Sequence, residues 1–130
     1  MTTVDLAKHI RKTVKPGTGG VDILLVDDEP EALDELSSVL SLRGIRSERA
    51  ETVGSALKIL TENKQLSIVI TDLRMPGQSG LQMIESITKS AEFADRIFSF
   101  IIITGHGDLF SARRSLLNGV VDFKIGRAHV

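Results

Sequence analysis

The sequence contains no cysteine, no tryptophan and no tyrosine among its 130 residues. The absence of cysteine excludes disulfides, thiol catalysis and thiolate metal sites. The absence of the two largest polar aromatics argues against an aromatic binding surface. Charge of one sign is not in excess either, because 16 Lys and Arg residues stand against 17 Asp and Glu residues. Since a nucleic-acid backbone requires a basic surface, we expect no nucleic-acid binding by this segment.

Long hydrophobic runs are also missing from the sequence. No run approaches the roughly 20 apolar residues of a membrane span, and the N-terminus lacks the apolar core of a signal peptide. We therefore expect a cytoplasmic protein with no membrane partner. The hydrophobic fraction of 42% and the charged fraction of 25% are typical of a single globular domain.

Residues 1–20 are predicted to be a leader and linker. Apolar residues recur at near-helical spacing between Val4 and Val14, and Pro16 with Gly17–Gly20 then breaks any helix. A helix this short is marginal without packing, so we expect a solvated segment rather than a helix that binds a partner or a membrane.

From residue 21 onward, short apolar segments alternate with stretches of helical periodicity. This alternation predicts a parallel five-stranded sheet with helices on both faces. In the common doubly wound order 2-1-3-4-5, the first and third strands flank a ligand-binding crevice at their carboxyl ends. The expected strands are residues 21–26, 45–50, 66–72, 97–104 and 120–125, and helices are expected after the first four of them.

Three of the expected strands end in polar side chains. Asp27 and Asp28 follow the first strand, Asp72 ends the third, and Thr104 ends the fourth. Because parallel strands place their carboxyl ends on one edge of the sheet, these side chains are expected to converge. Three carboxylates in one crevice repel one another unless a cation is present, and ligands that are all oxygens favour Mg²⁺.

Each of these acids also has a purely structural interpretation. Asp72 precedes a loop with Pro76 and Gly77, and an Asp in this position commonly bonds its own loop backbone. The acids around Pro30 favour the N-terminus of a helix through the helix dipole. Both roles are compatible with a site that is formed by the Asp residues.

Four segments of the chain resemble the receiver domains of two-component response regulators. The resemblance covers about Val21 to Phe123 and implies a flavodoxin-like doubly wound fold. The segments are Leu24–Glu29, Ile70–Gly77, Ile103–Asp108 and Asn118–Phe123.

The resemblance also implies a function. Asp72 would accept a phosphoryl group from the phosphohistidine of a sensor histidine kinase or a phosphotransfer protein. Asp27 and Asp28, together with Asp72 and the backbone carbonyl of Arg74, would hold Mg²⁺. A C-terminal output domain beyond this chain is a further implied partner, and the chain itself is expected to be a phosphoacceptor and not an enzyme.

The resemblance implies that Thr104 and Phe123 are the residues that switch upon phosphorylation. Beyond Phe123 the sequence departs from the family pattern. The family carries a phosphate-contacting Lys three positions past its last aromatic, where this chain has Gly126. Lys124 is the nearest candidate, but it is out of register. The final helix of the family is missing as well, so we expect one flank of the sheet to be uncovered.

The last six residues, 125–130, match the translation of a widely used sequencing adapter. We therefore expect a non-native tail, with the receiver domain truncated at about residue 124. This interpretation leaves the natural sequence ending near Phe123.

Two other functions compete with this one. Phosphatases of the haloacid-dehalogenase type also use an Asp nucleophile with Mg²⁺, but they place a second Asp two residues further on. Asp27 and Asp28 are adjacent, so the pattern does not fit. The second competitor is a receiver-like interaction module that no longer accepts phosphate, which the absent Lys would favour.

Overall fold

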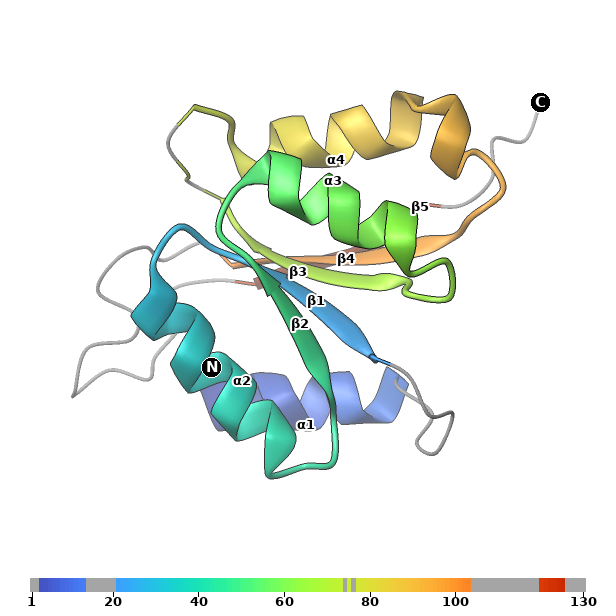
Figure 1. The fold of residues 1–130 in the computed structure, drawn as a ribbon. Coiled ribbons are helices and arrows are strands. Elements are labelled where there is room, and N and C mark those ends of the chain that lie inside the picture. Colours follow the sequence, from blue (N-terminus) through green and yellow to red (C-terminus); the bar gives the residue numbers. More distant parts are fainter. Residues whose placement is uncertain (1–2, 14–20, 74, 76, 104–119, 126–130) are drawn as a thin grey trace.

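The computed structural model describes residues 3–13, 21–73, 75, 77–103 and 120–125. Figure 1 shows a central sheet with helices on both of its faces. Helices α1 (Thr3–Thr13) and α2 (Pro30–Ser41) cover one face, and α3 (Val53–Glu62) and α4 (Gly80–Lys89) cover the other. The strands are β1 (Ile23–Val26), β2 (Ser47–Ala50), β3 (Ile68–Asp72), β4 (Phe98–Ile103) and β5 (Val120–Ile125), and a short 3₁₀ helix, Ala91–Phe93, precedes β4.

The strand order is β2-β1-β3-β4-β5, as the doubly wound pattern predicts. The first four strands pair in parallel, so their carboxyl ends lie on one edge. At this edge Val26 pairs with both Ala50 and Thr71, and Asp72 pairs with Ile103. The register therefore brings the residues after β1 next to the end of β3.

The direction of β5 differs from the prediction. This strand pairs antiparallel with β4, with Val120 opposite Ile103 and Ile125 opposite Phe98. The expectation of five parallel strands is therefore corrected to four. A chain that leaves the carboxyl end of β4 can pair back along the same strand without crossing the sheet, and antiparallel edge strands on parallel sheets are common.

The N-terminal segment also differs from the prediction, because it contains a packed helix. Leu6, Ala7 and Ile10 of α1 are 0%, 0% and 1% exposed. They belong to one apolar cluster with α2 and with Ile101 and Ile103 of β4. The expected solvated leader is therefore wrong, and the flank is not uncovered where α1 packs on it. The sheet strands carry apolar side chains on both faces, and the apolar stripe of α1 covers part of the second face.

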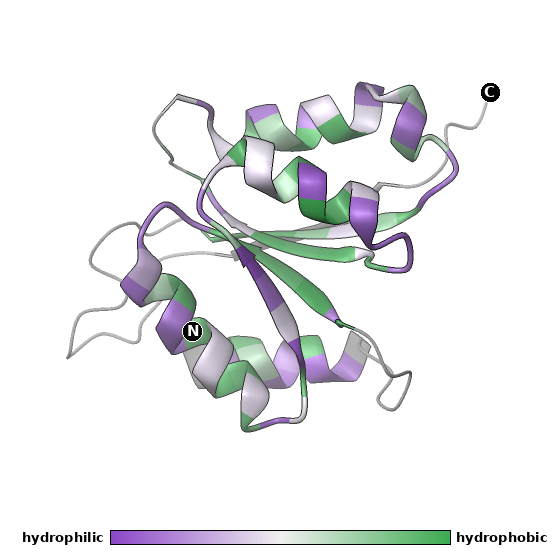
Figure 2. Ribbon diagram, viewed as in Figure 1, coloured by the Kyte–Doolittle hydropathy of each residue, from purple (hydrophilic) through white to green (hydrophobic). Residues whose placement is uncertain are grey.

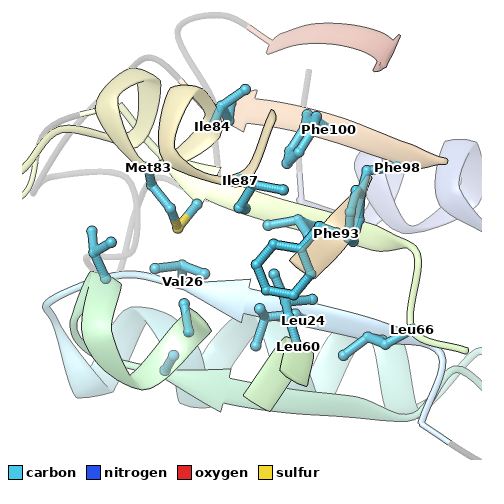
Figure 3. Close-up of a cluster of buried hydrophobic side chains, with 14 of the residues drawn as sticks. Leu24, Val26, Leu60, Leu66, Met83, Ile84, Ile87, Phe93, Phe98 and Phe100 are labelled. Atoms are coloured by element: carbon cyan, nitrogen blue, oxygen red, sulfur yellow. The ribbon is translucent and has the colours of Figure 1, made fainter. Parts of the chain in front are cut away.

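A second apolar cluster fills the space between the sheet and the helices α3 and α4. Figure 3 shows Phe93, Phe98 and Phe100 gathered with Ile87 and Leu60 in this layer. The rings of Phe93 and Phe98 lie edge to face with centroids 6.0 Å apart, a favourable aromatic geometry. In Figure 2 hydrophobic colours run along the central strands, whereas β2 carries hydrophilic ones.

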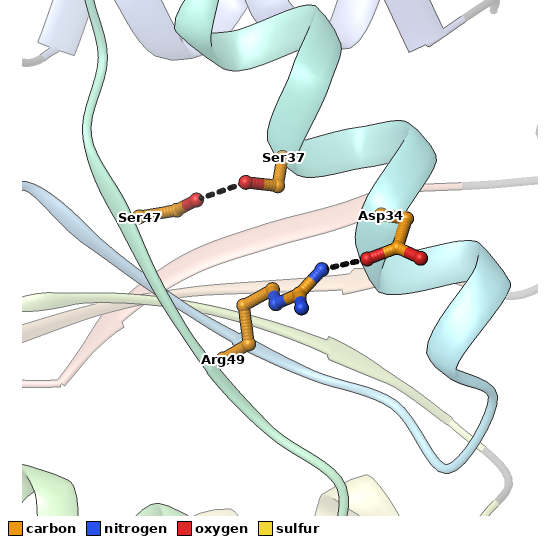
Figure 4. Close-up of polar contacts among 4 residues, drawn as sticks. All are labelled: Asp34, Ser37, Ser47 and Arg49. Atoms are coloured by element: carbon orange, nitrogen blue, oxygen red, sulfur yellow. Dashed lines mark hydrogen bonds and ion pairs between the residues drawn. The ribbon is translucent and has the colours of Figure 1, made fainter.

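The hydrophilic strand β2 is the edge that the sequence predicts, and polar contacts join it to α2. Arg49 of β2 forms an ion pair with Asp34 of α2, and the hydroxyls of Ser37 and Ser47 lie 3.0 Å apart (Figure 4). The Arg49 and Asp34 side chains are 44% and 65% exposed, so this pair contributes little to stability.

Side-chain caps define the starts of the two helices on the other face. Thr52 caps α3 by accepting a hydrogen bond from the Ser55 amide at 3.0 Å. Ser79 and Gln82 form a reciprocal capping box at the start of α4. Among the described residues, none of the helices has the length and hydrophobicity needed to cross a membrane.

Candidate functional site

The predicted cluster of carboxylates forms at the carboxyl edge of the sheet. Asp27 and Asp28 directly follow β1, and Asp72 is the last residue of β3. One carboxylate oxygen from each residue lies within 4.8 Å of the other two. Asp72 is 7% exposed, and the other two are half-buried. The convergence predicted from the strand ends is therefore present in the fold.

Backbone hydrogen bonds hold Asp27 in place. Its amide donates to the carbonyl of Ala50 at 3.1 Å, which extends the β1–β2 pairing by one residue. Its Oδ1 accepts a hydrogen bond from the amide of Glu29 at 2.9 Å. Pro30 then begins α2. This bond lies in the turn before α2, whose N-cap residue Glu29 has no side-chain cap, so Asp27 bonds the local backbone and also has its place in the cluster.

The surroundings of Asp27 disfavour its charged form. Its pKa is raised to about 7: burial is the largest cause, the hydrogen bond from the Glu29 amide opposes it, and the nearby carboxylates of Asp72, Asp28 and Glu29 add to the rise. The part of this shift that comes from the neighbouring carboxylates reflects the repulsion among their negative charges. A bound cation relieves this repulsion.

A small cavity lies next to the cluster. Asp27 and Asp72 line it together with residues of α2 and of the sheet. Most of its lining side chains are apolar, so they offer the two carboxyl groups no hydrogen bonds. Its lining consists of Leu25, Val26, Asp27, Ala32, Leu33, Leu36, Ile70, Asp72 and Ile103.

The chain after Asp72 is tied to the sheet and to α4. The Leu73 amide donates to the carbonyl of Ile103 at 3.1 Å, and the Gly80 amide donates to the carbonyl of Leu73 at 3.0 Å. Gly77 adopts a φ of 84°, a left-handed conformation that suits glycine. The end of the loop predicted after Asp72 is therefore hydrogen-bonded to its start.

The described structure does not test the other predicted site residues. Arg74 and Thr104 lie outside the described residues. In β5, Phe123 pairs with Phe100, and Lys124 pairs with Ser99 near the amino end of β4. These pairings place only the backbone of the two residues, so the switch role of Phe123 and the phosphate contact of Lys124 stay predictions.

The carboxylate cluster fits a hard divalent cation. All of its donors are oxygens, three carboxylates are close enough to share one ion, and the raised pKa of Asp27 shows that a positive charge is favoured there. Asp27, Asp28 and Asp72 are the residues that would hold Mg²⁺. The carbonyl of Arg74 stays a prediction.

Comparison with known proteins identifies the family of this arrangement. The sequence model described as "Response regulator receiver domain" matches residues 23–124. The response regulator TmoT of Ectopseudomonas mendocina is 36% identical over 103 residues, which cover 78% of this chain and 44% of that protein. The two-component response regulator PprB of Pseudomonas aeruginosa is 29% identical over 109 residues, covering 84% and 39%.

Solved structures show the same fold. A response regulator receiver protein from Pseudomonas putida is 32% identical with a TM-score of 0.60, covering 72% of this chain and 74% of that one. A receiver domain protein from Clostridium thermocellum is 35% identical with a TM-score of 0.58, covering 69% of each chain. The chain spans less than half the length of the two curated relatives named above, and α1 lies outside the matched residues.

Proposed function

Because this chain belongs to the receiver domain family of two-component response regulators, we propose that Asp72 accepts a phosphoryl group from the phosphohistidine of a partner kinase. The partner is a sensor histidine kinase or a phosphotransfer protein. The observation that carries the proposal is the convergence of Asp72 with Asp27 and Asp28 at the ends of two neighbouring strands. The chain acts as an acceptor in the cytoplasm and not as an enzyme with its own substrate.

The transfer needs a nucleophile and a way to neutralise charge. A carboxylate oxygen of Asp72 attacks the phosphorus atom of the phosphohistidine, a P–O bond forms, and the P–N bond breaks. The electron pair of the broken bond leaves with the imidazole nitrogen of the donor. The product is an acyl phosphate on Asp72. Asp72 is 7% exposed and lines a mostly apolar cavity, so few water molecules surround this group.

The neighbouring acids prepare the site for this step. Bound Mg²⁺ supplies positive charge to the oxygens of the transferring phosphoryl group. Asp27 is oriented for metal binding by the Glu29 amide, which donates to its Oδ1 at 2.9 Å. Asp28 adds a further carboxylate oxygen within 4.8 Å of the other two residues. We propose the backbone carbonyl of Arg74 as an additional ligand.

The response to phosphorylation is proposed to pass through β4. Asp72 pairs with Ile103, and Thr104 is the next residue in the chain. The hydroxyl of Thr104 would donate to a new phosphoryl oxygen, and this movement would alter the packing around β5, the strand that carries Phe123. The relatives are longer proteins, so we propose that an output domain in the full protein reads this change.

Phosphorylation by a small donor tests the proposal directly. The chain is incubated with acetyl phosphate and Mg²⁺, and intact mass is measured. One phosphoryl group is expected on the parent and none on Asp72→Asn. Asp95→Asn is the matched control, because Asp95 is exposed on the connection before β4. Equal labelling of the parent and Asp72→Asn would refute Asp72 as the acceptor.

One observation favours a second candidate function. Gly126 stands at the position where the family carries its phosphate-contacting Lys. A receiver-like module that binds its partner without accepting phosphate needs no such cation. The same mass measurement separates the two functions, because this module stays unlabelled in the parent as well as in Asp72→Asn.

A further inference from the structure

The first residue of α4, Gly80, lies directly against the backbone of Asp72. A Cβ built on Gly80 would be 2.4 Å from the carbonyl oxygen of Asp72, and 3.0 and 3.1 Å from two side-chain atoms of Thr71. The first distance is shorter than real Cβ contacts allow, and its partner is backbone that cannot rotate away. Gly80 does not have a positive φ, so glycine is required here for space and not for conformation.

Hydrogen bonds fix the backbone on both sides of this contact. The hydroxyl of Thr71 donates to the carbonyl of Asp72 at 2.9 Å. The amide of Gly80 donates to the carbonyl of Leu73 at 3.0 Å, and the amide of Leu73 donates to Ile103 at 3.1 Å. The peptide units that flank Leu73 are thus held between β4 on one side and the start of α4 on the other.

The start of α4 has little freedom to retreat from Asp72. Ser79 accepts a hydrogen bond from the Gln82 amide at 3.2 Å, and the Gln82 side chain accepts one from the Ser79 amide at 2.8 Å. Met83, Ile84 and Ile87 anchor the inner face of the helix in the apolar cluster of Figure 3. A side chain at Gly80 would therefore displace the end of β3, or the helix would lose both its cap and its packing.

We propose that Gly80 is a positioning residue for Asp72. Its missing side chain lets the first turn of α4 hold the end of β3 at the place where the Asp72 carboxylate meets those of Asp27 and Asp28. The inference rests on the proposed function only in treating this cluster as the site of Mg²⁺ binding and phosphoryl transfer. A close approach of this kind leaves no signal in one sequence beyond the glycine itself.

Two glycine substitutions test the proposal as a matched pair. Gly80 and Gly54 each lie in the first turn of a helix, but a Cβ at Gly54 would have no atom within 4 Å. Mg²⁺ affinity is measured by titration calorimetry, and folding by circular dichroism and thermal unfolding. We expect Gly80→Ala to keep its helical signal and to bind Mg²⁺ about tenfold more weakly than the parent, whereas Gly54→Ala binds as the parent does.

Each outcome of this test supports or overturns the proposal. Unchanged Mg²⁺ affinity in a folded Gly80→Ala overturns it, and so does an equal loss in Gly54→Ala. If Gly80→Ala fails to fold, Ser79→Ala decides, because it loosens the same turn without adding an atom near Asp72. Weakened affinity in that variant supports the proposal, and unchanged affinity overturns it.

The test also separates this proposal from the proposed function. A parent that binds Mg²⁺ but takes no phosphoryl group from acetyl phosphate refutes phosphoacceptance. The positioning role of Gly80 then still stands or falls on the affinities of the two variants. A parent that binds no Mg²⁺ contradicts both, because the carboxylate cluster then holds no metal.

Discussion

The carboxylates of Asp27 and Asp72 lie close enough at the ends of β1 and β3 for Asp72 to raise the pKa of Asp27. Burial is the larger cause of the shift, and the Asp28 carboxylate acts in the same direction. The folded protein therefore holds a proton on Asp27 more tightly than the unfolded chain does. This relationship connects the stability of the metal-free protein to pH and to metal binding.

The first prediction concerns the pH dependence of stability without metal. The pKa of Asp27 is about 7 in the folded protein, against its ordinary value of 3.8 in an unfolded chain. Between these values the folded state binds more protons than the unfolded state, so this contribution to stability falls as pH rises from about 4 to about 7. Urea unfolding of the parent and of Asp27→Asn in a chelator measures it, and the difference between the two isolates Asp27. A difference that is constant over this window would contradict the raised pKa.

The second prediction concerns Asp27→Asn at pH 8. The substitution keeps the size of the side chain and removes a partly buried negative charge, so the metal-free variant should have a higher Tm than the metal-free parent. Addition of Mg²⁺ should raise the Tm of the parent and have little effect on the variant, because the ion binds only the folded cluster. The exposed Asp95→Asn should follow the parent in both conditions. A variant that is less stable than the parent without metal would show that the cluster is not strained by repulsion.

How much the sequence predicts depends on whether the signal is local. Acids follow the first apolar segment and end the third, so each marks its own position at a strand end. Parallel pairing then brings Asp27, Asp28 and Asp72 together without further information. Periodicity likewise predicts the buried face of α4, with Met83 and Ile87 inward. Such features follow from the residues that carry them.

The features that sequence analysis missed depend on distant partners. The apolar spacing of α1 is visible, but the sheet face that buries Leu6 and Ile10 becomes known only in the fold. The direction of β5 likewise depends on which pairing with β4 is formed and not on the pattern Val120–Ile125. Gly80 is the third case, because its role comes from a contact with Asp72, which is eight positions away in the chain.

A third prediction concerns Arg96, which binds the end of α3 and the connection from α3 to β3. Its guanidinium donates to the carbonyls of Leu60 at 2.6 Å, Asn63 at 3.0 Å and Leu66 at 2.6 Å. It also lies 4.9 Å from the centroid of the Phe98 ring. Lysine cannot reproduce this fork, so Arg96→Lys should lower the free energy of unfolding by about 2–3 kcal/mol. Urea unfolding checks this, and the exposed Arg46→Lys is the control. Equal stability of the two variants would mean that the carbonyl contacts contribute nothing.

The last prediction concerns α1, the helix outside the matched family region. Ile10 is 1% exposed and packs in the cluster that contains Ile101 and Ile103 of β4. Ile10→Ala should lower the free energy of unfolding by about 2–5 kcal/mol, because it removes buried methyl groups and leaves a cavity. Lys8 lies on the exposed side of the same helix, so Lys8→Ala should change stability by less than about 0.5 kcal/mol. Urea unfolding of the two variants compares the buried and exposed sides of one helix. If Ile10→Ala were as stable as Lys8→Ala, α1 would not belong to the cooperative fold. Another segment would then have to bury the apolar side chains of β3 and β4 that α1 contacts.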